Sequence, residues 1–105
     1  MAILIDGEPR ETIAAADRGL QFGDGVFETI AVRGGSALLV DAHLDRLHQG
    51  AGRLGIDPGV DRDTLVREIH EVGRELDRGV VKLIVTRGAG GRGYAPPASP
   101  RRPGW

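Results

Sequence analysis

The first half of the chain alternates short apolar stretches with turn residues, a pattern typical of strands. Residues 26–33 are rich in β-forming side chains and end at Gly34 and Gly35, after which residues 36–40 form a second such stretch. A Gly-Gly pair can adopt the positive φ angles that a tight hairpin requires. The pattern therefore predicts a β-hairpin over residues 26–40.

Two segments precede this hairpin. The apolar residues 3–5 predict a short strand that ends in a two-residue turn at Asp6 and Gly7. Residues 13–25 combine glycine with charged side chains and are predicted to be irregular.

Two amphipathic helices are predicted in the middle of the chain. One has Asp41 as its N-cap and runs to about Gly55, and the second begins after Asp61. Glycines inside helices cost about 1 kcal/mol each relative to alanine, so tertiary packing must hold both helices. The apolar positions, three or four residues apart, are Leu44, Leu47, Ala51 and Leu54 in the first helix and Leu65, Ile69, Val72 and Leu76 in the second.

The last predicted strand lies at residues 80–86, an almost continuous apolar run that is typical of a central strand covered on both faces. A glycine-rich loop at residues 87–94 and a proline-rich tail at residues 95–105 follow. This order predicts an α+β fold, a small, mostly antiparallel sheet with two helices packed on it, over residues 1–94. We interpret residues 95–105 as a tail or the start of a connection to another domain.

Composition and charge exclude several classes of protein. With 14 basic and 15 acidic residues and a net charge of −1, the chain has no broad basic field for nucleic acid. No apolar run approaches the roughly 20 residues of a membrane span, and the first residues do not resemble a signal peptide. Without cysteine there can be no disulfide and no thiolate metal site. We expect a cytoplasmic protein that binds neither nucleic acid, membrane nor metal.

The loop after the last strand has a glycine pattern that needs interpretation. Residues 88–93 read G-x-G-x-x-G, but the dinucleotide-binding fingerprint also needs a helix that starts there and an acidic residue about 20 positions later. Pro96 and Pro97 follow instead, which argues against a dinucleotide site. A flexible connecting loop and a loop that presents Arg92 to an anionic ligand remain as alternatives.

Two further candidates have a simple interpretation and a functional one. His43 and Arg46 lie three positions apart on the first helix, where a solvated pair is the simpler interpretation, although an arginine near a helix start can bind phosphate.

Lys82, the only lysine, lies inside the last strand. A desolvated lysine there would be a nucleophile, but a lysine that extends its ammonium to water is the preferred interpretation.

Three segments together carry a resemblance to a known family. They are residues 17–29 (DRGLQFGDGVFET), the helix motif HLDRL at residues 43–47, and residues 87–94 (RGAGGRGY). In order and spacing they resemble the class IV aminotransferases, which are fold-type IV pyridoxal-phosphate enzymes, and the resemblance covers nearly the whole chain. Within this family the segments are most similar to aminodeoxychorismate lyases.

The resemblance implies roles for four residues. Arg46 matches the arginine that binds the phosphate of pyridoxal phosphate, Arg92 and Tyr94 match residues that help bind the substrate carboxylate, and Phe27 matches an aromatic residue of the substrate pocket. D-amino-acid transaminases commonly have tyrosine at the position of Phe27 and histidine at that of Tyr94. Both differences favour the lyase.

The chain also departs from the family pattern. The family's Schiff-base lysine and the acidic partner of the pyridine nitrogen lie downstream of the glycine-rich loop, in a larger C-terminal domain. The sequence stops at Trp105, before either residue, and Lys82 does not match the lysine's position. No catalytic residue is therefore assigned, and these 105 residues by themselves are expected to be inactive.

The leading hypothesis is the N-terminal part of an aminodeoxychorismate lyase, which would convert 4-amino-4-deoxychorismate into 4-aminobenzoate and pyruvate for folate biosynthesis. The resemblance implies a homodimer for the full-length enzyme. A D-amino-acid or branched-chain aminotransferase of the same family is the alternative. A second alternative, of another class, is a non-enzymatic domain that binds a phosphorylated ligand or a partner chain.

Overall fold

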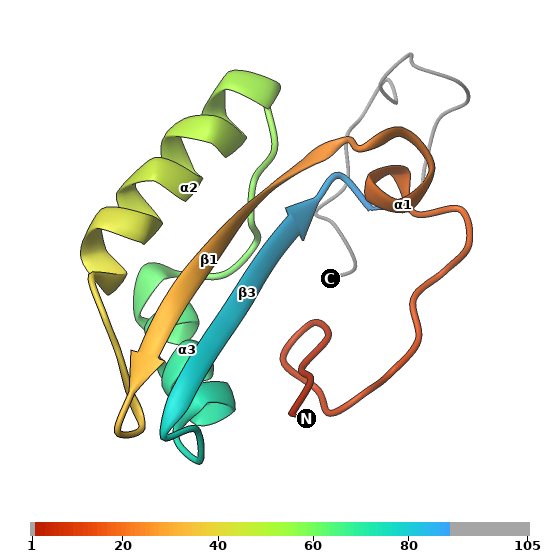
Figure 1. The fold of residues 1–105 in the computed structure, drawn as a ribbon. Coiled ribbons are helices and arrows are strands. Elements are labelled where there is room, and N and C mark those ends of the chain that lie inside the picture. The colour runs from red at the N-terminus through yellow and green to blue at the C-terminus, as the bar shows by residue number, and fades with distance from the viewer. Residues whose placement is uncertain (1, 89–105) are drawn as a thin grey trace.

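The computed structural model describes residues 2–88. Within this range, two long helices pack against a three-stranded antiparallel sheet, and a short helix precedes the sheet (Figure 1). The predicted α+β class, with a mostly antiparallel sheet and two helices packed on it, is confirmed. In chain order the elements are α1 (Arg18–Phe22), β1 (Gly25–Arg33), β2 (Ser36–Ala37), α2 (Val40–Leu54), α3 (Arg62–Gly73) and β3 (Arg78–Thr86).

The predicted hairpin is present, although its second strand is short. Gly34 and Gly35 have φ angles of 57° and 77°, which is the left-handed conformation expected of the turn. β2 contains only two residues because the chain turns into α2 directly after it. In the sheet order β2-β1-β3, β1 pairs along its whole length with β3, from Gly25 opposite Thr86 to Arg33 opposite Arg78.

The start of α3 is as predicted, and the start of α2 is not. The Asp61 side chain accepts a hydrogen bond from the Thr64 amide, as an N-cap does. In α2 the N-cap is Leu39, with a φ of 56° and no capping side chain, so Asp41 lies in the first turn instead. The tight passage from β2 into α2 makes the helix begin two residues earlier than an N-cap at Asp41 predicts.

The prediction that residues 80–86 are covered on both faces is wrong. α2 and α3 pack on the same face of the sheet (Figure 1), so burial alternates along β3. Val81 and Val85 are buried, whereas Val80, Lys82 and Ile84 are exposed on the other face. Among the described residues β3 is an edge strand that pairs with β1 only.

The N-terminal segment also differs from its prediction. Residues 3–5 form no strand, and Ile5 makes only an isolated bridge to Glu8 around the Asp6-Gly7 turn. The irregular segment predicted at residues 13–25 contains α1. Asp17 caps this helix by accepting hydrogen bonds from the Gly19 and Leu20 amides, a local interaction that apolar periodicity does not reveal.

The core lies between the helices and the covered face of the sheet. Glycines in the helices permit close approach there: a Cβ atom on Gly73 would lie 3.2 Å from side-chain atoms of Val32 and Val81, and one on Gly50 would lie 3.1 Å from Val26 Cγ1. The packing that these glycines allow compensates for their low helix propensity. The buried apolar residues are Ile30, Val32, Leu44, Leu47, Ala51, Ile56, Leu65, Ile69, Val81 and Val85.

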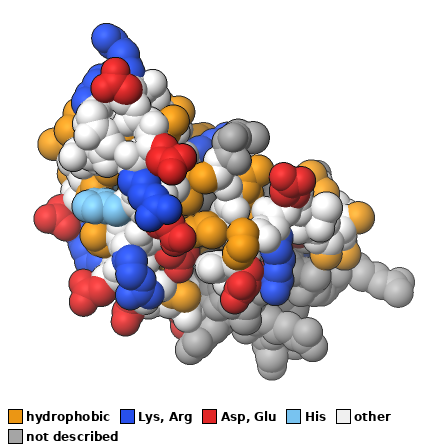
Figure 2. Space-filling view, turned by 90° about the horizontal axis from the view of Figure 1, so that it is seen from below, with side chains coloured by type: hydrophobic (Ala, Val, Ile, Leu, Met, Phe, Trp, Pro, Cys, Tyr) orange, Lys and Arg blue, Asp and Glu red, His pale blue; other side chains and the backbone are white. Residues whose placement is uncertain are grey.

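The described surface mixes both signs of charge. Figure 2 views the molecule from below, where acidic and basic side chains are interspersed and hydrophobic side chains lie between them. Among residues 2–88, no helix has both the length and the apolar character needed to cross a membrane.

Candidate functional site

The side chains of Glu28, His43 and Arg46 form an ion cluster between β1 and α2, which we call the Glu28 cluster. Oε1 of Glu28 accepts hydrogen bonds from His43 Nδ1 at 2.6 Å and from Arg46 Nη2 at 2.7 Å. Arg46 Nε donates to Oε2 at 2.9 Å and lies 3.1 Å from Oε1. Both carboxylate oxygens are therefore occupied, and one edge of the guanidinium group lies against them.

Burial of Glu28 and the charge of Arg46 determine the ionisation of the cluster. The Glu28 side chain is 6% exposed, whereas that of Arg46 is 70% exposed. Hydrogen bonds from Arg46, supported by one from His43, outweigh the effect of burial and hold the pKa of Glu28 below its usual value. The same hydrogen bonds, donated by Arg46 to Glu28, raise the pKa of Arg46. The cluster thus contains a buried carboxylate, ionised at neutral pH, and a cation that reaches solvent.

Two periodicities bring the cluster together. Residues three apart on a helix share a face, which places His43 and Arg46 side by side on α2. Alternation along β1 places Glu28 on the same face as the buried residues Ile30 and Val32, beneath α2. The prediction that His43 and Arg46 are a solvated pair is wrong for His43, whose side chain is only 18% exposed and binds Glu28. Arg46 is 70% exposed, although it binds the same carboxylate.

Arg46 has the donor geometry for a phosphate group. Glu28 binds the edge formed by Nε and Nη2, and the hydrogen bonds that Arg46 makes within residues 2–88 do not involve Nη1. An exposed guanidinium edge with two nitrogens matches phosphate oxygens in both charge and shape. Arg46 therefore fits the phosphate of pyridoxal phosphate.

Phe27 and Lys82 lie on the other face of the sheet. Phe27 is 60% exposed, and the Lys82 ammonium lies 4.7 Å from the centroid of its ring, a cation–π contact. Lys82 is thus on the face opposite the side chain of Glu28, which holds Arg46. The structure therefore does not place the phosphate-fitting arginine and the expected pocket residue Phe27 on one surface.

A second ion cluster holds the point where the chain leaves β3. Oδ2 of Asp24 accepts hydrogen bonds from Arg18 Nε and Arg87 Nε, both at 2.8 Å, and both arginines are buried. Burial alone would raise the pKa of Asp24, but the hydrogen bonds from the two arginines hold it below its usual value. The Gly88 carbonyl accepts a hydrogen bond from the Arg18 amide, so the chain is fixed up to the first glycine of the loop.

Arg92 and Tyr94, the predicted substrate-binding residues, and the boundary after residue 94 lie outside the described residues. Their expected roles stay predictions. Arg87 and Gly88, where the loop begins, are the last residues with a described position.

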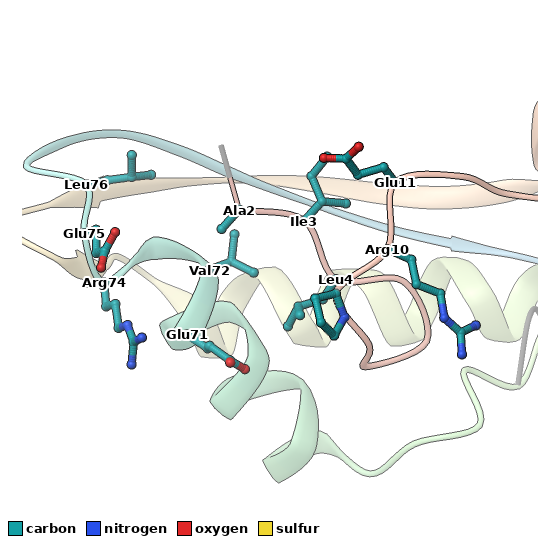
Figure 3. Close-up of a pocket in the computed structure, with 11 residues that line it drawn as sticks. Ala2, Ile3, Leu4, Arg10, Glu11, Glu71, Val72, Arg74, Glu75 and Leu76 are labelled. Carbon is teal, nitrogen blue, oxygen red and sulfur yellow. The ribbon is translucent and has the colours of Figure 1, made fainter.

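Of two cavities among residues 2–88, the larger is lined by neither Phe27 nor Arg46. It has a volume of about 760 Å³ and lies between the N-terminal segment and the end of α3 (Figure 3). Apolar side chains such as Leu4 and Val72 line it, together with charged residues that include Arg10 and Glu71. A second cavity, of about 540 Å³, is lined in part by Lys82 and Ile84. Neither cavity is lined by Phe27 or Arg46.

The sequence interpretation gave no role to Glu28 or Asp24, the two carboxylates on which these clusters are built. For Glu28 a signal existed. It occupies an inward-facing position in the alternation of Val26, Ile30 and Val32, and a carboxylate on an apolar face needs a partner. For Asp24 the signal was absent, because its two partners are separated by most of the chain and meet only in the folded protein.

The fold is that of the N-terminal region of fold-type IV enzymes. The family model described as amino-transferase class IV matches residues 25–103. The chain belongs to this family, which confirms the predicted resemblance.

Individual relatives agree with this assignment. The crystal structure of 4-amino-4-deoxychorismate lyase from Pseudomonas aeruginosa matches 92% of this chain at 52% identity, with a TM-score of 0.75. A bifunctional aminodeoxychorismate lyase / D-amino acid transaminase from Mycobacterium tuberculosis is 39% identical over 106 residues, 93% of this chain. The pyridoxal-phosphate-bound structure of a hypothetical aminotransferase from Mycobacterium tuberculosis matches 85% of the chain at 36% identity, with a TM-score of 0.70.

The chain spans about a third of the length of these relatives. It covers 36% of the lyase structure, 36% of the bifunctional enzyme and 32% of the cofactor-bound structure. Relatives in the family bind pyridoxal phosphate.

Proposed function

We propose that these residues are the N-terminal part of a pyridoxal-phosphate-dependent aminodeoxychorismate lyase, which converts 4-amino-4-deoxychorismate into 4-aminobenzoate and pyruvate for folate biosynthesis. The observation that carries the proposal is the match to the Pseudomonas aeruginosa lyase, at 52% identity over 92% of the chain. Phe27, where D-amino-acid transaminases commonly have tyrosine, supports the same choice.

The residues of this segment bind and position rather than react. Pyridoxal phosphate, when bound, supplies the electron sink for the bond cleavage. Arg46 binds the phosphate through its exposed edge, and the Glu28 cluster keeps that guanidinium at the surface of α2. Phe27 lines the substrate pocket, and Arg92 and Tyr94 bind the substrate carboxylate. The lysine that holds the cofactor belongs to the part of the enzyme beyond Trp105, and the complete enzyme is a cytoplasmic homodimer.

An aminotransferase with D-amino-acid substrates is the second candidate. This candidate is supported by the relative from Mycobacterium tuberculosis, which is a bifunctional aminodeoxychorismate lyase / D-amino acid transaminase. The same phosphate contact at Arg46 serves both reactions, so the two candidates differ in what the substrate pocket accepts.

Product analysis of the complete natural polypeptide distinguishes the candidates. The purified protein is incubated with 4-amino-4-deoxychorismate and, separately, with D-alanine and 2-oxoglutarate. Release of 4-aminobenzoate supports the lyase, and amino transfer without 4-aminobenzoate assigns the transaminase instead. If neither reaction occurs although the protein binds pyridoxal phosphate, both proposals are overturned.

A further inference from the structure

The proposed function gives Glu28 no role beyond its contact with Arg46, yet Glu28 is nearly buried and both of its carboxylate oxygens accept hydrogen bonds. It is a nearly buried carboxylate on a strand that pairs along its whole length with β3, and its backbone position is therefore fixed by the sheet. Three hydrogen bonds from Arg46 and one from His43 occupy its two oxygens. The carboxylate is held from two sides and in turn holds the guanidinium group by two nitrogens.

Arg46 by itself would not be fixed. Its side chain is 70% exposed, and a long exposed arginine loses rotamer freedom when it binds an anion. A two-point hydrogen bond to a rigid acceptor sets both the position and the plane of the guanidinium group. The edge that bears Nη1 then has one orientation before any ligand arrives.

We propose that Glu28 is the positioning residue for Arg46, and that His43 holds Glu28 in place. Glu28 fixes one edge of the guanidinium so that the opposite edge is oriented toward the phosphate of the ligand. The proposal rests on that part of the proposed function in which Arg46 binds phosphate. It does not depend on whether the reaction is a lyase or a transaminase reaction.

The negative charge of Glu28 allows a positioning role to be distinguished from a direct electrostatic effect on the ligand. A carboxylate next to an anion site repels the anion, so a purely electrostatic account has Glu28 weakening phosphate binding. Its benefit to binding must come from position. A variant that keeps the charge and shifts the carboxylate therefore tests the role directly.

Glu28→Asp is that variant, because it shortens the side chain by one methylene group and conserves the charge. In the complete natural polypeptide, the dissociation constants of pyridoxal phosphate and of pyridoxal, which has no phosphate, are measured by absorbance or fluorescence titration. We expect the constant for pyridoxal phosphate to rise by about tenfold, which corresponds to a loss of about 1.4 kcal/mol of binding free energy, while that for pyridoxal stays unchanged. Glu75→Asp, an exposed site after α3, is the matched control.

A merely structural salt bridge gives a different result, because loss of stability weakens the binding of both compounds and lowers the melting temperature in parallel. His43→Ala is the second variant. It keeps the Glu28 and Arg46 side chains and removes only the hydrogen bond by which His43 holds Oε1 of Glu28. It is expected to weaken the binding of pyridoxal phosphate selectively, but less than Glu28→Asp does.

The proposal is overturned if Glu28→Asp changes the dissociation constants of pyridoxal phosphate and pyridoxal equally, or changes neither. If Glu28→Asp does not fold, the same comparison for His43→Ala decides. If the wild-type protein binds pyridoxal as tightly as pyridoxal phosphate, Arg46 binds no phosphate and the proposal is likewise overturned. Failure of the lyase reaction shows in product analysis alone and leaves these binding constants unaffected.

Discussion

Phe27 and Glu28 are adjacent on β1, and their side chains project from opposite faces of the sheet. Glu28 lies beneath α2, 6% exposed and bound to Arg46, whereas Phe27 is 60% exposed on the other face, beneath the Lys82 ammonium. One strand therefore carries the carboxylate that holds the phosphate-fitting arginine and the aromatic residue expected in the substrate pocket. The sheet separates the two side chains, so Phe27 and the carboxylate that binds Arg46 lie on different sides of β1.

Arg46→Ala should reduce retention of pyridoxal phosphate far more than Arg53→Ala. Both residues lie on α2, but only Arg46 matches the family's phosphate contact and has its guanidinium held by Glu28. The measurement is the cofactor-to-protein ratio after extensive desalting of the complete natural polypeptide. Equal ratios in the two variants would contradict the assignment of Arg46.

Arg92→Lys should raise the KM for substrate by about tenfold, because a point charge replaces a planar fork suited to a carboxylate. Steady-state kinetics of the complete enzyme measure the effect, with cofactor content checked in parallel. An unchanged KM would remove Arg92 from the substrate site.

Asp24→Asn should destabilise the protein at neutral pH by about 2 kcal/mol, because two buried arginines lose the charge of their shared carboxylate. The folded-state pKa of Asp24 lies below its ordinary value of 3.8, so its contribution to stability is present above that pH. The contribution is lost as the pH falls through the lowered folded-state pKa.

The measurement for this prediction is chemical unfolding of wild type and Asp24→Asn between pH 2 and pH 7, with the difference between them expected to shrink at the acid end. Asp45→Asn is the control, since the Asp45 side chain is 64% exposed in its pair with Arg62 and should change stability little. A difference that stays constant across the range would argue against the ionised carboxylate as the cause.

Gly52→Ala should stabilise α2 by up to about 1 kcal/mol, and Gly73→Ala should fall short of that gain in α3. A Cβ atom on Gly52 meets no atom within 4 Å, whereas one on Gly73 meets Val32 and Val81 at 3.2 Å in the core. Thermal melts of the two variants test the difference. The packing argument fails if Gly73→Ala stabilises as much as Gly52→Ala.

A protein consisting of these 105 residues should show neither lyase nor transaminase activity and should retain no pyridoxal phosphate after desalting. It should also self-associate, because apolar side chains including Phe27, Val80 and Ile84 are exposed on the open face of the sheet. Absorbance spectra and size-exclusion elution test both expectations. A cofactor absorbance band that is present in the wild-type fragment and absent in Lys82→Ala would show that Lys82 binds the cofactor covalently. Elution as a monomer would contradict self-association.

The sequence by itself determined the two long helices, the hairpin turn and the family. The spacing of Leu44, Leu47 and Ala51 predicted α2, and the Gly34-Gly35 pair predicted the turn of the hairpin, because both depend on neighbouring residues alone. The three family segments were sufficient to find the class IV aminotransferases, since they need only order and spacing.

Only the tertiary structure decided which faces are covered and which charges meet. The apolar run at residues 80–86 looks the same whether helices cover one face of a sheet or both, and here they cover one. Glu28 and Arg46 are 18 positions apart, and Asp24 and Arg87 are 63 apart. Such pairs form because packing places buried carboxylates beside cations that can compensate the cost of their burial, and no local pattern encodes that placement.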